Sequence, residues 1–139
     1  MTRAGKTITV SRAEARLYLG KAQQFLEEAR SAMSERRYDA VMLNGIHAAL
    51  SGGDAVTVAL AGRRSADPDH QRAADLLEQV AGGSEEIGSR SRQLRMLLAK
   101  KNVVEYESRR ATAKEAAEAV DRAGKLVAWA REVLERAKL

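Results

Sequence analysis

The chain of 139 residues contains no cysteine, one proline, one phenylalanine, one tryptophan and three tyrosines. Without cysteine, a disulfide framework and a thiolate metal site are both excluded. The two histidines are too few for the chain alone to assemble a zinc centre, so we expect neither a metal nor a cofactor. Scarce proline and aromatic residues, beside many alanine, leucine and charged residues, predict an all-α protein.

Long apolar segments are also absent from the sequence. No run of about eighteen apolar residues occurs, so the chain offers no candidate membrane span. The N-terminal MTRAGKTITV lacks the apolar core of a signal peptide. We therefore expect a cytoplasmic protein that does not bind a membrane. The length fits one domain, with residues 1–10 as a flexible N-terminal arm and residues 11–139 as a single helical bundle.

The formal net charge of +5 is compatible with anionic partners but does not require them. Basic residues are concentrated in one predicted helix and the turn after it: Arg90, Arg92, Arg95, Lys100, Lys101, Arg109 and Arg110. Solvated helix positions would explain this concentration as well as a binding surface does. The chain has no aromatic-rich strand and no recognition-helix motif, so nucleic-acid binding would act through phosphates.

Helical periodicity and capping residues define the first two helices. Ser11 and Glu14 form a sequence capping box that opens a helix over about residues 12–34, and a second helix follows over about 38–60. The small residues on the second helix include Ala48, Ser51, Gly52 and Ala55. These positions allow another backbone to come close, so they predict a close helix contact and, we infer, a homodimer.

Three further helices follow along the chain. Asp67 as N-cap and Pro68 at the first helical position predict a short helix over about 68–81. A fourth helix covers about 84–106, and the last opens at a second capping box at Thr112. Short connections between long helices make them antiparallel neighbours. The predicted architecture is an antiparallel up-and-down helical bundle of four main helices plus one short helix.

A candidate site lies near the end of the fourth predicted helix. There an apolar stripe runs into the polar residues Lys101, Asn102, Glu105 and Tyr106, well away from either end of the chain. Lys101, Glu105 and Tyr106 are the candidate catalytic residues, although a phenol is a poor base at neutral pH. Asn102 and Arg95 are candidate ligand-binding residues.

Two further candidates for ligand binding lie on the second predicted helix. His47 and Asp54 are seven residues apart and therefore share a helix face. They could line a groove opposite Lys101, or they could form a buried polar pair. The sequence leaves both interpretations open.

Three stretches of the sequence occur in a recognisable order: AMSERRYDAVMLNGIHAALSGGDAV, GRRSADPDHQRAADLL and LRMLLAKKNVVEYESR. Their order and spacing resemble those of HEPN domains, small helical proteins of prokaryotic defence and toxin–antitoxin systems. The resemblance covers nearly all of the chain. It implies a homodimer in which both subunits line one groove, and it implies a nucleotidyltransferase as a partner.

In catalytic members of that family, the resemblance implies metal-independent RNA cleavage by an Arg and a His on the third long helix. The His takes the 2′-hydroxyl proton and the Arg holds the phosphate. Here Lys101 stands in place of the Arg, without its bidentate fork, and no His follows it. Arg64 and His70 satisfy the family's spacing, but they span a turn that contains Pro68, so we treat that match as chance.

Three functions remain open from the sequence. The one we favour is a non-catalytic dimeric module that binds RNA, a nucleotide or a partner such as a nucleotidyltransferase, in a toxin–antitoxin or defence context. The second is a metal-independent endoribonuclease toxin that uses Lys101, Glu105 and Tyr106, with His47. The third is a structural helical scaffold, for which Lys101→Ala would change no binding measurement.

Overall fold

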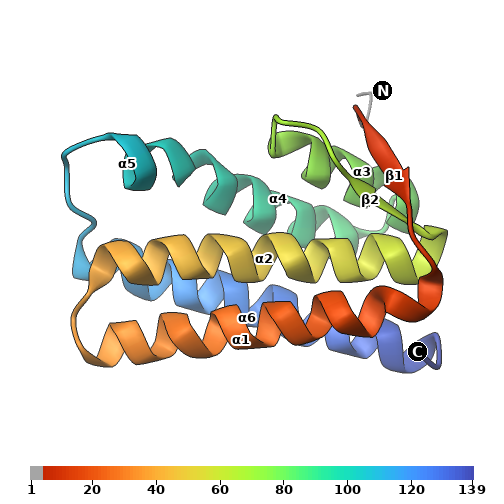
Figure 1. Ribbon diagram of the computed structural model, residues 1–139, viewed down its shortest axis with the longest axis horizontal. Coiled ribbons are helices and arrows are strands. Elements are labelled where there is room, and N and C mark those ends of the chain that lie inside the picture. The colour runs from red at the N-terminus through yellow and green to blue at the C-terminus, as the bar shows by residue number, and fades with distance from the viewer. Residues whose placement is uncertain (1–4) are drawn as a thin grey trace.

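The computed structural model describes residues 5–139 and confirms an all-α bundle. Its long helices are α1 (Ala15–Ser34), α2 (Tyr38–Ala61) and α6 (Ala113–Arg136), which pack against one another. A second layer lies over α2 on the side away from α1 (Figure 1). This layer contains α3 (Gln71–Ala81), α4 (Glu85–Ala99) and α5 (Lys101–Tyr106).

Helix α2 is the centre of the bundle, because it contacts every other α-helix of the described chain. Its small residues serve these contacts. A Cβ atom added at Gly52 would lie 2.9 Å from Leu126 Cδ2 on α6, and one at Gly45 would lie 3.6 Å from Ala119 Cβ. The predicted close helix contact is therefore confirmed, but it is made within the chain. These residues no longer argue for a homodimer, which stays a prediction.

The fourth predicted helix, over 84–106, is divided in the structure into α4 and α5. The division falls at Lys100, whose backbone N–H donates to Leu97 O at 3.1 Å. This i to i−3 bond tightens the last turn of α4, as in a 3₁₀ turn, and α5 begins at the next residue. The candidate residues at 101–106 consequently lie on a short helix of their own.

The short helix α3 begins at Gln71, later than the predicted residue 68. The carboxylate of Asp67 accepts hydrogen bonds from the N–H groups of Asp69, at 2.9 Å, and Lys6, at 3.1 Å. Asp69 in turn accepts from Gln71 N at 3.0 Å. Asp67 and Pro68 therefore belong to a turn before the helix, because the side chain of Asp67 holds the backbone of that turn.

One of the two predicted capping boxes is present. Thr112 Oγ1 accepts from Glu115 N at 3.1 Å, and Glu115 Oε1 accepts from Thr112 N at 3.0 Å. At the other position, the Ser11 side chain makes no capping hydrogen bond, and Arg12–Glu14 form a 3₁₀ turn before α1. The capping box predicted at Ser11 is therefore wrong.

A two-stranded antiparallel ribbon was not predicted from the sequence. Strand β1 (Thr7–Thr9) pairs with β2 (Arg63–Ser65), and Ile8 lies opposite Arg64. Residues 7–9 therefore form a strand against the chain that leaves α2, in place of the arm expected over residues 1–10. Residues 1–4 lie outside the described part of the chain.

The described helices include none with the length and apolar character needed to cross a bilayer.

Candidate functional site

Helix α5 and the segment before α3 line a cleft of about 500 Å³, here called the α5 cleft. The predicted site residues Lys101, Asn102 and Tyr106 line it together. His70 and Gln71 contribute from the opposite element. The cleft exists because α3 and α4 run antiparallel, which brings the start of α3 beside the end of α4.

Lys101 and Glu105 form an ion pair one helical turn apart on α5. Lys101 Nζ lies 2.8 Å from Glu105 Oε2, and both side chains are partly covered. The hydrogen bond from Lys101 lowers the pKa of Glu105, so the carboxylate is ionised at neutral pH. A phosphate that enters the cleft therefore shares the Lys101 ammonium with Glu105.

His47 faces this ion pair from α2. Burial lowers the pKa of His47, and the positive charge of Lys101 lowers it further, while Glu105 acts in the opposite direction. The His47 ring also packs on Phe25 of α1, with 5.5 Å between the ring centroids. His47 is consequently a mostly neutral imidazole at pH 7 beside a cation and a carboxylate.

His70 is the site residue that the sequence interpretation missed. It lines the α5 cleft, and it is close enough to His47 to contribute to lowering the pKa of that residue. The chain has only two histidines, and the fold brings them near each other, although His47 is on α2 and His70 immediately precedes α3. Their rarity was the signal that could have identified His70, whereas the spacing to Arg64 drew attention to the wrong partner.

Arg95 is engaged elsewhere and is not among the residues that line the α5 cleft. Its Nη2 lies 2.7 Å from Asp75 Oδ1 and 3.2 Å from Glu78 Oε1 on α3. The guanidinium therefore links two helices of the second layer. The structure gives no direct support to its predicted role as a ligand-binding residue.

Asp54 lies in surroundings different from those of His47, although both are on α2. Burial raises the pKa of Asp54 to about 7, against the opposing effects of the cations Arg64 and Lys21. Arg64 Nε donates to the Tyr18 hydroxyl at 3.1 Å. Arg64 is thus directed towards Tyr18 and Asp54, which agrees with treating its spacing to His70 as chance.

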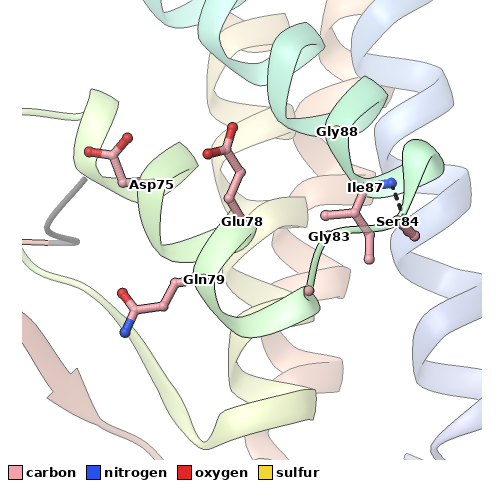
Figure 2. A pocket seen from close by; sticks show the side chains of 8 residues that line it. Asp75, Glu78, Gln79, Gly83, Ser84, Ile87 and Gly88 are labelled. Carbon is pink, nitrogen blue, oxygen red and sulfur yellow. Dashed lines mark hydrogen bonds between the residues drawn. The ribbon is translucent and has the colours of Figure 1, made fainter. Parts of the chain in front are cut away.

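A second cleft, of about 550 Å³, opens between the end of α3 and the start of α4 (Figure 2). Asp75, Glu78 and Gln79 line it from α3, and Ser84 and Ile87 line it from the other side. Ser84 Oγ accepts from Ile87 N at 3.3 Å, which caps α4. No predicted site residue lies in this cleft, so the candidate chemistry is at the α5 cleft.

Metal ligands do not cluster in the described residues, where no group of three or more His, Cys, Asp or Glu side chains could hold an ion. The polar side chains that line the α5 cleft are instead an ammonium, an imidazole, two amides, a phenol and a carboxylate, those of Lys101, His70, Gln71, Asn102, Tyr106 and Asp69. Such groups can bind a phosphate through charge-assisted hydrogen bonds and can transfer protons.

Comparison with known protein families gives a match to the HEPN domain over residues 15–133. Comparison with curated proteins and with solved structures gives no match. The matched residues extend from the start of α1 into the last turns of α6 and include every candidate site residue. The chain therefore belongs to the HEPN domain family.

Proposed function

We propose that the protein is a HEPN-family module that binds single-stranded RNA or a nucleotide in the α5 cleft without cleaving it. The observation that carries this proposal is the presence of Lys101, Asn102, Tyr106 and His70 around one cleft of about 500 Å³. Lys101 and His70 suit a phosphate, and Asn102 can donate to or accept from a ligand. Tyr106 is 77% exposed, and its ring offers a face on which a base can stack.

The arrangement of α5 favours binding over catalysis. In an acid–base mechanism the cation must stabilise charge that develops on the phosphate. Here the ammonium of Lys101 is already paired with Glu105 at 2.8 Å. Lysine also lacks the planar fork with which arginine grips two phosphate oxygens.

We further propose that the module acts as a homodimer, with a nucleotidyltransferase as a partner, in a toxin–antitoxin or defence context. Family membership supports this part of the proposal. Helix α2 adds a surface, since Leu43 and Leu50 are only half-buried on the face that also carries His47. A subunit contact there would place the second subunit beside the α5 cleft.

The binding test uses fluorescence anisotropy of a labelled ten-nucleotide single-stranded RNA, and competition by AMP, at low salt. Lys101→Ala should weaken binding by roughly 1 to 2 kcal/mol, the range of a charge-assisted hydrogen bond. It should also flatten the dependence of affinity on salt, because one fewer phosphate is neutralised.

Lys125→Ala is the matched control. Lys125 also pairs with a carboxylate one turn away, with 3.0 Å between its Nζ and Asp121 Oδ2, but it lies on α6 and outside the cleft. This variant should bind as the parent does. No binding by the parent, or equal binding by the Lys101 and Lys125 variants, would refute the proposal.

A second candidate function is metal-independent endoribonuclease activity, favoured by the proximity of His47 and His70. In that reaction the neutral imidazole of His47 removes the proton of a 2′-hydroxyl, and the 2′-oxygen attacks the adjacent phosphorus. The bond to the 5′-oxygen breaks, His70 acts as the general acid that donates a proton to that oxygen, and a 2′,3′-cyclic phosphate remains.

Purified protein incubated with RNA and a chelator separates the two functions. Cleavage that resists the chelator, and that is abolished by His47→Gln and by His70→Gln, is expected only of the ribonuclease. Intact RNA that is nevertheless bound by the parent, and less so by Lys101→Ala, is expected only of the binding module.

A further inference from the structure

We propose that Asp75 and Arg95 are positioning residues that set the separation of the two walls of the α5 cleft. This inference deepens the proposed function and rests on it. One wall is residues 68–71, immediately before and at the start of α3, and the other is α5, immediately after α4. The distance between the walls therefore depends on how α3 is docked on α4.

An ion-pair network joins the two helices at this point. The Asp75 carboxylate is buried, with 4% of its side chain exposed, and both its oxygens are used. Arg72 Nη1 on α3 and Arg95 Nη2 on α4 each lie 2.7 Å from it. Arg95 Nη2 also lies 3.2 Å from Glu78 Oε1, so a single guanidinium contacts two turns of α3.

The network extends to the cleft itself through Gln71. Gln71 Nε2 donates to the backbone carbonyl of Arg95 at 3.2 Å, and Gln71 also lines the α5 cleft next to His70. Arg95 precedes Lys101 by six positions on the other side. At about 1.5 Å per helical residue, Arg95 lies roughly 6 Å along α4 from Ala99, which lines the cleft.

Apolar packing alone would not fix this separation. Leu76 and Leu77 of α3 are buried in the core and hold the helix on the bundle. Apolar contacts are non-directional, so they permit small rotations and slides of a helix. Charge-assisted hydrogen bonds are directional and short, so the pair between Asp75 of α3 and Arg95 of α4 selects one register of α3 on α4, and Arg72 on α3 holds the Asp75 carboxylate in place.

The register matters because a site must hold its groups within fractions of an ångström to bind one ligand geometry well. His70 immediately precedes α3 and Lys101 begins α5, and the peptide chain between them contains the whole of α3 and α4. The ion-pair network links α3 to α4 directly through side chains. Without this network the bundle would stay folded, but the two walls of the cleft would lose their correct separation.

The experiment compares Arg95→Met, Arg95→Lys and Arg131→Met with the parent protein. Arg131→Met is the control, because it removes an exposed ion pair, Arg131 Nε to Glu135 Oε1 at 3.1 Å, on α6. Two properties are measured: AMP affinity, and the nuclear magnetic resonance signals of the two histidine rings. The ring signals report the surroundings of His70 without any ligand.

Arg95→Met should stay folded, weaken AMP binding by about tenfold and shift the His70 ring signals. Arg95→Lys should recover most of the affinity, because its ammonium still reaches a carboxylate, and Arg131→Met should change neither property. Should Arg95→Met fail to fold, Glu78→Gln removes the more exposed ion pair of Arg95. It should weaken AMP binding and shift the His70 ring signals in the same direction, but by less.

Folded Arg95→Met with parental ring signals and parental AMP affinity would overturn the inference, because the network would then be a stabilising contact only. If the parent binds neither the labelled RNA nor AMP, the proposed function fails, and the ring signals alone decide the positioning role. His70 ring signals that shift in Arg95→Met but not in Arg131→Met then support the positioning role. Ring signals that do not shift in Arg95→Met overturn the positioning role.

Discussion

Replacing Asp54 by asparagine should make the protein more stable at alkaline pH. Burial raises the pKa of Asp54 from 3.8 to about 7, which means that folding disfavours its ionised form. In the unfolded chain the carboxyl loses its proton near its ordinary pKa. Stability therefore falls as pH rises between these two values, and the full cost is present above the higher one.

The size of the effect follows from the two pKa values. Each pH unit between them corresponds to ~1.4 kcal/mol, so complete ionisation costs at most ~4 kcal/mol. Because Asp54 is only half-buried in the structure, solvent lowers this cost, and we expect ~2 kcal/mol at pH 8 and under ~1 kcal/mol at pH 5. Asparagine has nearly the same shape and no charge, so it avoids the cost.

Urea unfolding of Asp54→Asn and of the parent, at pH 5 and pH 8, measures this difference. Asp121→Asn serves as the control, since Asp121 is exposed on α6 and should change little at either pH. A variant no more stable than its parent at pH 8, or equally more stable at both pH values, would refute the reasoning. RNA binding by the same variant tests whether Asp54 has the ligand-binding role predicted from the sequence.

The packing of α2 predicts that Gly52→Leu lowers the free energy of unfolding by more than ~2 kcal/mol, because even a Cβ there crowds Leu126. By contrast, Gly20→Ala should raise it by about 1 kcal/mol, since nothing lies within 4 Å of the added atom. Thr112→Ala should cost about 1 kcal/mol of stability, whereas Ser11→Ala should be nearly neutral because its side chain makes no cap; thermal unfolding compares the two. Light scattering at micromolar concentration should give twice the chain mass, and a monomer would contradict the proposed dimer.

The sequence predicted the parts of the fold that depend on local pattern. The apolar run of α2 and the capping box at Thr112 are properties of a few neighbouring residues, and both are present in the structure. Ser11 carries the same capping pattern, but the chain enters there from strand β1, a pairing made with residues more than fifty positions away. That partner leaves no periodic signal in the sequence.

The site shows the same division between local and distant information. Lys101 and Glu105 could be identified because one helical turn separates them, and the structure pairs them. Arg95 was expected to face a ligand. Its true partner is Asp75, a buried carboxylate on another helix, and the spacing of Arg95 along its own helix gives no sign of that partner. His70 was set aside because its spacing to Arg64 spans the turn at Pro68, and the sequence carries no sign that its neighbours in space come from α2 and α5.

The six residues of α5 make the two walls of the cleft unequal in local stability. An isolated helix of that length does not persist in water, so the order of α5 depends on its contacts with α2 and on the pair between Lys101 and Glu105. The facing wall is continuous with α3, whose leucines lie in the core. A ligand that displaces Glu105 from Lys101 would remove one support of α5 and supply another, so binding and local unfolding of this helix are thermodynamically coupled.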